Sequence, residues 1–151
     1  MGVLVHSFTD NALKILEKRY LQKDIEGNYE TPETLFRRVS RVMAEVEFKY
    51  GSTSKEVKEL ENRFFDLMWS LDFLPNSPTL MNAGIGAGTL SACYVMDIED
   101  NMSSIMDTAK DQAMIEKFGG GVGFSLSGLR PKGHSILTTQ GKACGPINVL
   151  R

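Results

Sequence analysis

The chain has 151 residues, of which 42% are hydrophobic and 24% charged, a composition typical of one globular domain. Its net charge of −2 gives no basis for long-range attraction to nucleic acid or to an anionic membrane, so neither is expected as a partner. No apolar run approaches the roughly 20 residues needed to cross a bilayer. Two cysteines are too few for a disulfide framework, so we expect a cytoplasmic protein with reduced thiols.

The first half of the chain predicts three helices. Asp10 can cap the first helix. The run Thr31-Pro32-Glu33 starts the second with a capping hydroxyl, a proline at the first helical position and an acid in the first turn. Thr53 and Glu56 match a capping box at the start of the third. Apolar side chains repeat at helical spacing in all three, so we expect them to pack as a small helical layer.

The second half predicts an α/β arrangement. Two prolines in Leu74-Pro75-Asn76-Ser77-Pro78 exclude a regular helix there. Leu90 to Met96 then predicts a short buried strand, and Val122 to Leu126 a second strand. Between them, Asn101 or Ser103 can start a helix. A strand, a helix and a strand in this order indicate a right-handed crossover between parallel strands. The chain stops as a new apolar segment begins, which indicates a portion cut from a longer protein.

Four glycines in the run Gly119-Gly120-Gly121-Val122-Gly123 weaken both helix and strand, so the run needs a reason. The end of a helix accounts for one or two of them. The other interpretation is close approach of the backbone to a ligand whose phosphate or sugar oxygens accept from free N–H groups. The spacing matches neither the phosphate-binding loop with its lysine nor the dinucleotide-binding fingerprint.

Few other residues are candidates for chemistry. Cys93, in the middle of the predicted strand, is most simply a small core residue, but it lies between the proline turn and the glycine run. Cys144 is expected in an exposed loop, and a disulfide between the two stays open because spacing does not give geometry. Arg130 and Lys132 form a basic turn that either faces solvent or holds a phosphate. No cluster of metal-ligating residues occurs, so no metal site is predicted.

Four segments occur in a fixed order along the chain and together resemble a known family. They are Pro75 to Gly84, Leu90 to Val95, Gly119 to Ser125 and Leu129 to Gly133. In this order they resemble the large catalytic subunit of ribonucleotide reductases. The glycine run and the basic turn look most like the adenosylcobalamin-dependent class. The resemblance extends over essentially the whole chain.

The resemblance implies a fold and a reaction. The fold is a ten-stranded α/β barrel preceded by a helical region, which divides this chain into a helical region at 1–72 and the start of the barrel at 73–151. The reaction replaces the ribose 2′-hydroxyl with hydrogen to make deoxyribonucleotides for DNA synthesis. A thiyl radical abstracts the 3′-hydrogen, and a redox-active cysteine pair then supplies two electrons and ends as a disulfide.

The resemblance also implies roles for individual residues. Cys93 matches the N-terminal member of the reducing cysteine pair. The positions that contact the substrate nucleotide are matched by Ser77, Ala92, Cys93 and Gly121. Those near the allosteric site, where a deoxynucleotide effector selects the substrate base, are matched by Asp100 and Arg130. Cys144 stands where serine is more usual, so it is not assigned as the second reducing cysteine.

By the same resemblance, the complete enzyme binds a ribonucleoside diphosphate or triphosphate, a deoxynucleotide effector and adenosylcobalamin. It is a homodimer, and a thioredoxin-type protein reduces it. In the family, the radical-bearing cysteine and the second reducing cysteine lie beyond the segment that corresponds to this chain. We therefore expect the chain to be inactive without a C-terminal reductase segment.

Two alternatives remain open at this point. The chain could be a non-catalytic nucleotide-binding remnant of the same fold, in which case replacing Cys93 by serine would leave its function intact. It could instead be a fragment of a metal-radical-dependent reductase subunit, which needs a partner protein rather than cobalamin. Cobalamin dependence of the complete enzyme separates that case.

Overall fold

The structure is a computed structural model that describes residues 8–150. Its internal contacts divide the chain into two compact units, Met1–Ala92 and Cys93–Arg151, and each is described by itself. The boundary that the sequence predicts between residues 72 and 73 concerns the domains of the complete protein and stays a prediction. Within residues 8–150, no helix is long and apolar enough to cross a membrane.

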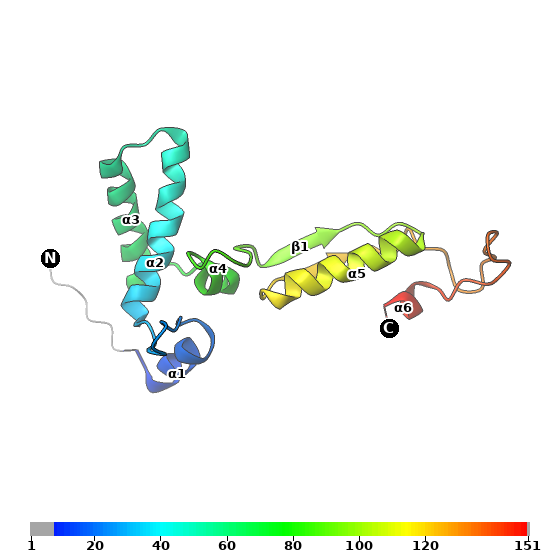
Figure 1. The fold of residues 1–151 in the computed structure, drawn as a ribbon, viewed down its shortest axis with the longest axis horizontal. Helices are drawn as coiled ribbons and strands as arrows, with labels where there is room; N and C mark the ends of the chain where they lie inside the picture. The colour runs from blue at the N-terminus through cyan, green and yellow to red at the C-terminus, as the bar shows by residue number, and fades with distance from the viewer. Residues whose placement is uncertain (1–7, 151) are drawn as a thin grey trace. The chain divides into compact units, whose positions relative to one another are not determined.

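The first unit is helical in the part that the structure describes (Figure 1). Its elements are α1 (Asp10–Arg19), α2 (Pro32–Glu45), the 3₁₀-helix η1 (Val46–Tyr50), α3 (Ser54–Trp69) and α4 (Ser77–Asn82). The three helices predicted from the sequence are confirmed as α1, α2 and α3. Helices α2 and α3 lie side by side and are connected through η1.

Side-chain caps start these helices where the sequence predicts, with one shift. The hydroxyls of Thr31 and Thr53 each accept a hydrogen bond from the backbone N–H three residues later, at 3.2 Å and 3.3 Å. Glu56 completes the second capping box by accepting from the N–H of Thr53 at 2.8 Å. The cap of α1 is Thr9 rather than Asp10, which is the first helical residue and complements the positive end of the helix.

The helical layer has one hydrophobic core, as the apolar spacing predicts. Its buried members are Leu35, Phe36, Val39, Phe65, Met68, Leu80 and Ala83. Trp69, the only tryptophan of the chain, packs against this core and stacks on Phe65 with ring centroids 5.6 Å apart. Because Leu80 lies on α4, this short helix is part of the same core.

The prediction that the proline segment excludes a helix is wrong, because α4 forms there. Asn76 caps α4, and its Oδ1 accepts a hydrogen bond from the N–H of Thr79 at 2.9 Å. Pro78 is in the first turn of the helix, where a backbone N–H has no partner within the helix, so the proline removes no hydrogen bond. The helix ends before Gly84, which has a positive φ of 82°.

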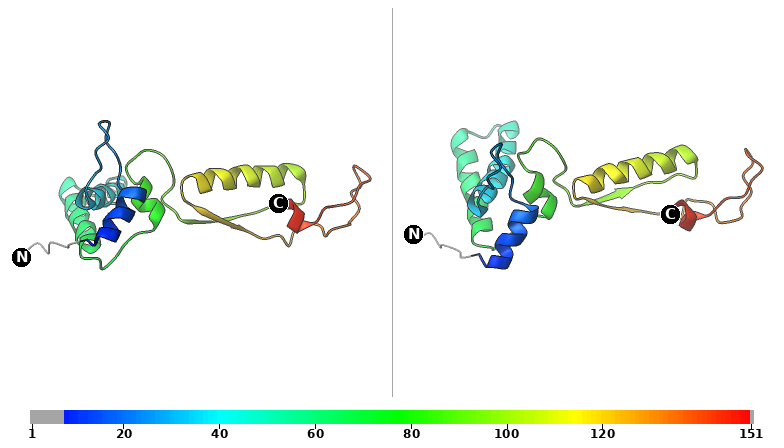
Figure 2. Two further views of the ribbon diagram at one scale, coloured as in Figure 1. Left: turned by 90° about the horizontal axis from the view of Figure 1, so that it is seen from below. Right: turned by 60° about the horizontal axis from the view of Figure 1, so that its bottom comes forward.

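The second unit begins with the predicted strand, helix and strand. Strand β1 (Cys93–Met96) pairs in parallel with β2 (Gly121–Phe124), and α5 (Met102–Lys117) connects them. Figure 2 shows α5 running along the two strands. A last helical turn, α6 (Pro146–Val149), follows an irregular segment. The α/β class and the parallel pairing are therefore confirmed.

The predicted first strand differs from β1 in two ways: β1 is shorter, and only every second residue of it is half-buried. The strand begins at Cys93 rather than at Leu90, so Cys93 is its first residue and not its middle. Side chains alternate along β1: Tyr94 and Met96 are half-buried, whereas Cys93 and Val95 are exposed. Val95 is 92% exposed. A run of apolar residues predicts burial on both faces, but in this unit only one face of the sheet is packed.

Candidate functional site

Cys93 and Gly121 are neighbours on the exposed face of the two-stranded sheet. They are Cα partners in the parallel register, each at the first position of its strand. Exposed and half-buried residues alternate along each strand, and both Cys93 and Gly121 are exposed, so they lie on the same face of the sheet. The structure therefore brings together two residues that the sequence assigns to the substrate site, although 27 residues of chain separate them.

The glycine run divides into positions that the fold requires and a position that it does not. Gly119 has a φ of 86° and follows the last turn of α5, so it serves as a helix end. A Cβ on Gly120 would lie 2.7 Å from Cγ2 of Ile115, so close packing on α5 excludes a side chain there. A Cβ on Gly123 would meet nothing within 4 Å. The fold thus accounts for Gly119 and Gly120, and it gives no structural reason for a glycine at Gly123, which pairs in register with Val95.

The two cysteines are separate thiols. Cys93 and Cys144 are both free and both exposed, so the disulfide left open by the sequence does not form in this structure. Cys144 lies in an irregular segment as predicted, and its Sγ is 3.7 Å from the carbonyl oxygen of Gly145. Among the described residues, both thiols are therefore exposed to solvent.

Asp100 and Arg130 form an ion pair within the second unit. Nε of Arg130 is 2.5 Å from Oδ2 of Asp100, and its Nη2 donates to the backbone oxygen of Asp100 at 3.2 Å. The hydrogen bond from Arg130 holds the pKa of the Asp100 carboxyl below its usual range. The pair joins the loop before α5 to the loop after β2. The sequence placed both residues near one site, and the structure places them in contact.

The surface beside this ion pair is acidic. An open hollow at the N-terminal half of α5 is lined by polar and acidic side chains, among them Asp97, Glu99, Asp107 and Asp111. These carboxylates repel a nucleotide phosphate, whereas Arg130 and the neighbouring Lys132 attract one.

Ser77 and Ala92 belong to the first unit, so they are described apart from Cys93 and Gly121. Ser77 is the first residue of α4 and is half-buried. Its Oγ is 3.0 Å from the hydroxyl oxygen of Tyr20, which directly follows α1. Ala92 is half-buried directly before β1. The sequence named Ser77 but missed Tyr20, because the two residues are 57 positions apart and no local pattern connects them.

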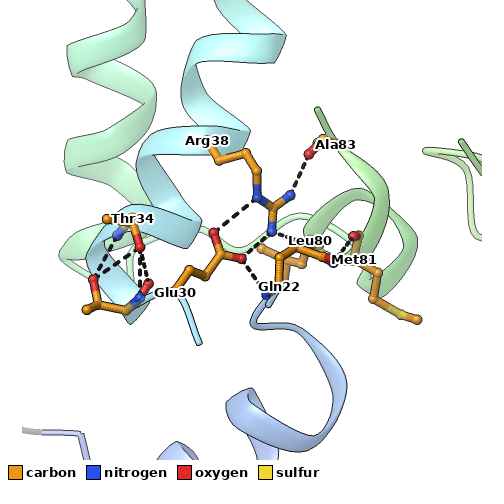
Figure 3. A network of polar contacts seen from close by, with 8 residues as sticks. Gln22, Glu30, Thr34, Arg38, Leu80, Met81 and Ala83 are labelled. Carbon is orange, nitrogen blue, oxygen red and sulfur yellow. Dashed lines mark hydrogen bonds and ion pairs between the residues drawn. The ribbon is translucent and has the colours of Figure 1, made fainter. Parts of the chain in front are cut away.

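A polar network in the first unit was also missed by the sequence (Figure 3). Glu30 accepts from Arg38 at 2.8 Å and 3.2 Å, and from the N–H of Gln22 at 2.8 Å. Arg38 also donates to the backbone oxygens of Leu80 and Ala83. The spacing of eight residues between Glu30 and Arg38 is no helical ion-pair signal, because the helix begins only at Pro32.

Comparison with known proteins agrees with the division of the chain into a helical unit and a β–α–β unit. Residues 6–88 match the family model "Ribonucleotide reductase, all-alpha domain", and residues 91–151 match "Ribonucleotide reductase, barrel domain". A vitamin B12-dependent ribonucleoside-diphosphate reductase of Thermoplasma acidophilum is 37% identical over an alignment covering 95% of this chain and 26% of that protein. One from Mycobacterium tuberculosis is 40% identical, covering 93% of this chain and 20% of its own length.

More distant relatives carry another name. The ribonucleoside-diphosphate reductase subunit alpha of Helicobacter pylori is 30% identical over 92% of this chain and 17% of that protein. The chain thus spans about a quarter or less of the length of these curated relatives. Two consecutive family models cover nearly all of the chain, and the helical unit and the β–α–β unit match them in order. The chain belongs to the ribonucleotide reductase family.

Proposed function

We propose that this chain is the N-terminal part of a reductase that converts ribonucleoside diphosphates or triphosphates to deoxyribonucleotides for DNA synthesis. The observation that carries the proposal is the Cys93 thiol. It is exposed on the open face of the sheet, directly opposite Gly121. Cys144 is equally exposed, so what distinguishes Cys93 is its place in register with Gly121, a second residue assigned to the substrate site.

In this proposal Cys93 supplies half of the reducing equivalents. The ribose 2′-hydroxyl leaves as water and a hydrogen replaces it. Two thiols lose two protons and two electrons in the same overall step, and a disulfide forms between them. Cys93 is one of these thiols. The second belongs to another part of the complete reductase, because Cys144 is not its proposed partner. This chain alone is accordingly proposed to be inactive.

The substrate contacts follow from positions with small side chains. Ala92 and Gly121 flank Cys93, in the chain and in the sheet respectively, and neither carries a bulky group. The proposal assigns them to close approach of the nucleotide. Ser77 is proposed to contact the substrate through its hydroxyl, which can donate one hydrogen bond and accept two.

The ion pair of Asp100 and Arg130 is proposed as part of the deoxynucleotide effector site. Arg130 uses Nε and Nη2 toward Asp100, which holds the guanidinium in one orientation. A planar, oriented guanidinium can bind a phosphate of the effector with a second pair of donors. Regulation of substrate choice would then pass through the loops that this pair joins.

We further propose that the complete reductase is cobalamin-dependent, because the relatives most similar to this chain include two named for vitamin B12. Bound adenosylcobalamin supplies the radical that starts the reaction. Within residues 8–150, no group of three or more His, Cys, Asp or Glu side chains is placed to hold a metal ion.

The remaining partners are proposed for the complete reductase. A thioredoxin-type protein regenerates the two thiols after each turnover, since the reaction leaves a disulfide. The complete protein is proposed to act as a cytoplasmic homodimer. These assignments rest on the family and not on a surface of this chain.

The two free cysteines allow a matched test. Cys93→Ser and Cys144→Ser make the same chemical change at two exposed thiols of the same unit. In a complete reductase that contains residues 1–151, we expect Cys93→Ser to abolish CDP reduction and Cys144→Ser to keep at least half of it. Equal activity of the two variants would contradict the proposal. If both variants bind CDP as the unsubstituted protein does and neither thiol affects its function, a nucleotide-binding remnant becomes the better interpretation.

A further inference from the structure

Helix α4 carries Ser77 and is too short to hold itself in place. It has six residues, fewer than an isolated helix needs to be stable in water. Its orientation must therefore come from contacts with other elements of the first unit. The core side of α4 is buried through Pro78, Thr79 and Leu80, but apolar packing alone leaves room for the helix to shift.

Directional contacts hold both ends of α4, and they come from the segment between α1 and α2 and from Arg38 on α2. At the N-terminal end, the hydroxyl of Tyr20 is 3.0 Å from Oγ of Ser77. At the C-terminal end, Nε2 of Gln22 donates to the backbone oxygen of Met81 at 2.9 Å. Tyr20 and Gln22 are two residues apart, so one short stretch of chain contacts both ends of the helix.

Arg38 and Glu30 complete the C-terminal contact. Arg38 donates to the backbone oxygens of Leu80 and Ala83, which belong to the unpaired carbonyls that every helix end leaves. Glu30 holds Arg38 by two hydrogen bonds and also accepts from the N–H of Gln22 (Figure 3). The side chains of Arg38 and Glu30 are only 13% and 14% exposed, so solvent screens this pair weakly.

We propose that Tyr20, Gln22, Glu30 and Arg38 form a clamp that positions α4, so that the hydroxyl of Ser77 is presented to the substrate in one orientation. These four are positioning residues: they act through Ser77 and do not touch the substrate. The inference rests on the proposed function, in which Ser77 contacts the nucleotide.

The contact with Tyr20 orients the hydroxyl itself. A serine hydroxyl rotates freely unless a partner selects one direction. When Tyr20 donates to Oγ of Ser77, the hydrogen of Ser77 is left for an oxygen of the substrate. When Ser77 donates to Tyr20, its lone pairs face the substrate. In both cases Tyr20 restricts the orientations of the Ser77 hydroxyl before the substrate binds. Less conformational freedom is then lost on binding, so the substrate binds more tightly without a new contact.

Two conservative variants test the clamp, one at each end of α4. Tyr20→Phe removes one hydroxyl and keeps the ring, and Gln22→Met removes the donor to Met81 and keeps the length of the side chain. The matched control is Tyr50→Phe, because Tyr50 is 78% exposed on η1 of the same unit. Loss of one such hydrogen bond is expected to raise the dissociation constant of CDP about three- to ten-fold.

The measurement is equilibrium binding of CDP to the complete reductase in the wild-type and Ser77→Ala backgrounds. We expect Tyr20→Phe and Gln22→Met to weaken CDP binding in the wild type, and Tyr50→Phe to leave it unchanged. In the Ser77→Ala background, Tyr20→Phe should have less than about a two-fold effect, because residues that act through one group are not additive. Thermal unfolding of each variant shows whether the unit remains folded, as does hydrogen exchange of the Ala83 amide, which follows α4 and donates to the backbone oxygen of Thr79.

The outcomes separate the clamp from the function on which it rests. If Ser77→Ala leaves CDP binding unchanged, the proposed substrate contact of Ser77 is wrong. If Ser77→Ala weakens binding but Tyr20→Phe and Gln22→Met do not, the clamp is wrong and the contact stands. Equal effects of Tyr20→Phe in both backgrounds also overturn the clamp, since Tyr20 would then not act through Ser77.

Discussion

The two units differ in how far they bury their own apolar side chains. In the helical unit, Leu35 is fully buried, and its core residues come from α2, α3 and α4. In the β–α–β unit, Val95 and Leu137 are 92% and 93% exposed. A single α-helix on one face of a two-stranded sheet cannot build a core of comparable size.

The two units also differ in where their stability and the proposed chemistry lie. The helical unit has a closed core, so its energetics are determined by its own residues. The β–α–β unit presents an open sheet face, and the proposed redox thiol lies on that face. Within this chain, the two units therefore predict different responses to the same substitution.

The largest expected contrast comes from one substitution made in both units. Leu35→Ala creates a cavity in the helical core and should lower the free energy of unfolding by about 3–5 kcal/mol. Leu137→Ala removes an exposed side chain and should change it by less than about 0.5 kcal/mol. Urea denaturation followed by the fluorescence of Trp69 and by circular dichroism measures both. Similar losses for the two variants would remove the contrast between the units.

A smaller effect is expected from charge pairs on helix α2. Arg38→Gln leaves Glu30 with only the N–H of Gln22 as a donor and removes the donor to two backbone carbonyls, and it should cost about 2–4 kcal/mol because the place is mostly buried. Arg41→Gln is the control, because its pair with Glu45 is exposed and should contribute less than about 0.5 kcal/mol. Thermal unfolding at two salt concentrations checks both values. An Arg38 effect as small as that of Arg41 would contradict the account.

Loss of a helix cap is expected to be smaller again. Oδ1 of Asn101 accepts from the N–H of Ser104 at 2.9 Å and starts α5. Asn101→Ala should destabilise this helix by about 1 kcal/mol. Since α5 belongs to the open unit, the change should appear as faster hydrogen exchange at the start of α5. The unfolding of the helical unit, measured through Trp69, should not move.

The pH dependence of the Asp100–Arg130 pair is the finest test. Arg130 lowers the pKa of Asp100 in the folded state, so the pair stabilises the fold at pH values above the ordinary 3.8, and this contribution is lost as the pH falls through the lowered pKa. An NMR titration of the Asp100 carboxyl should give a midpoint below 3.8, and Arg130→Gln should move the midpoint upward. An unchanged midpoint in the variant would show that the pair does not form in solution.

Local signals in the sequence were enough to predict most of the helices. Thr31 and Thr53 are hydroxyls followed by helix-starting residues, and each caps a helix as predicted. The proline segment failed because Pro78 was interpreted as a helix breaker, although proline is well tolerated in the first turn. A proline in the sequence predicts a helix start or a helix break, depending on its position in the helix. That position is unknown until the helix itself has been recognised.

The site was predictable only in part, because its residues are far apart in the sequence and come together only in the fold. The glycine run and Cys93 stood out as residue types, but their pairing in one register depends on a parallel sheet whose alignment the sequence does not specify. The contact between Tyr20 and Ser77 spans 57 positions and has no local signature. The exposure of Cys93 was missed because an apolar neighbourhood predicts burial, whereas burial depends on which elements cover the strand.

A single turnover shows whether Cys93 is a thiol of the reducing pair. The complete reductase is fully reduced, freed of external reductant, given CDP for one turnover, and its thiols are mapped by alkylation and mass spectrometry. The account predicts that Cys93 becomes part of a disulfide in proportion to the dCDP formed, while Cys144 remains a free thiol. Formation of dCDP with Cys93 still reduced would contradict it.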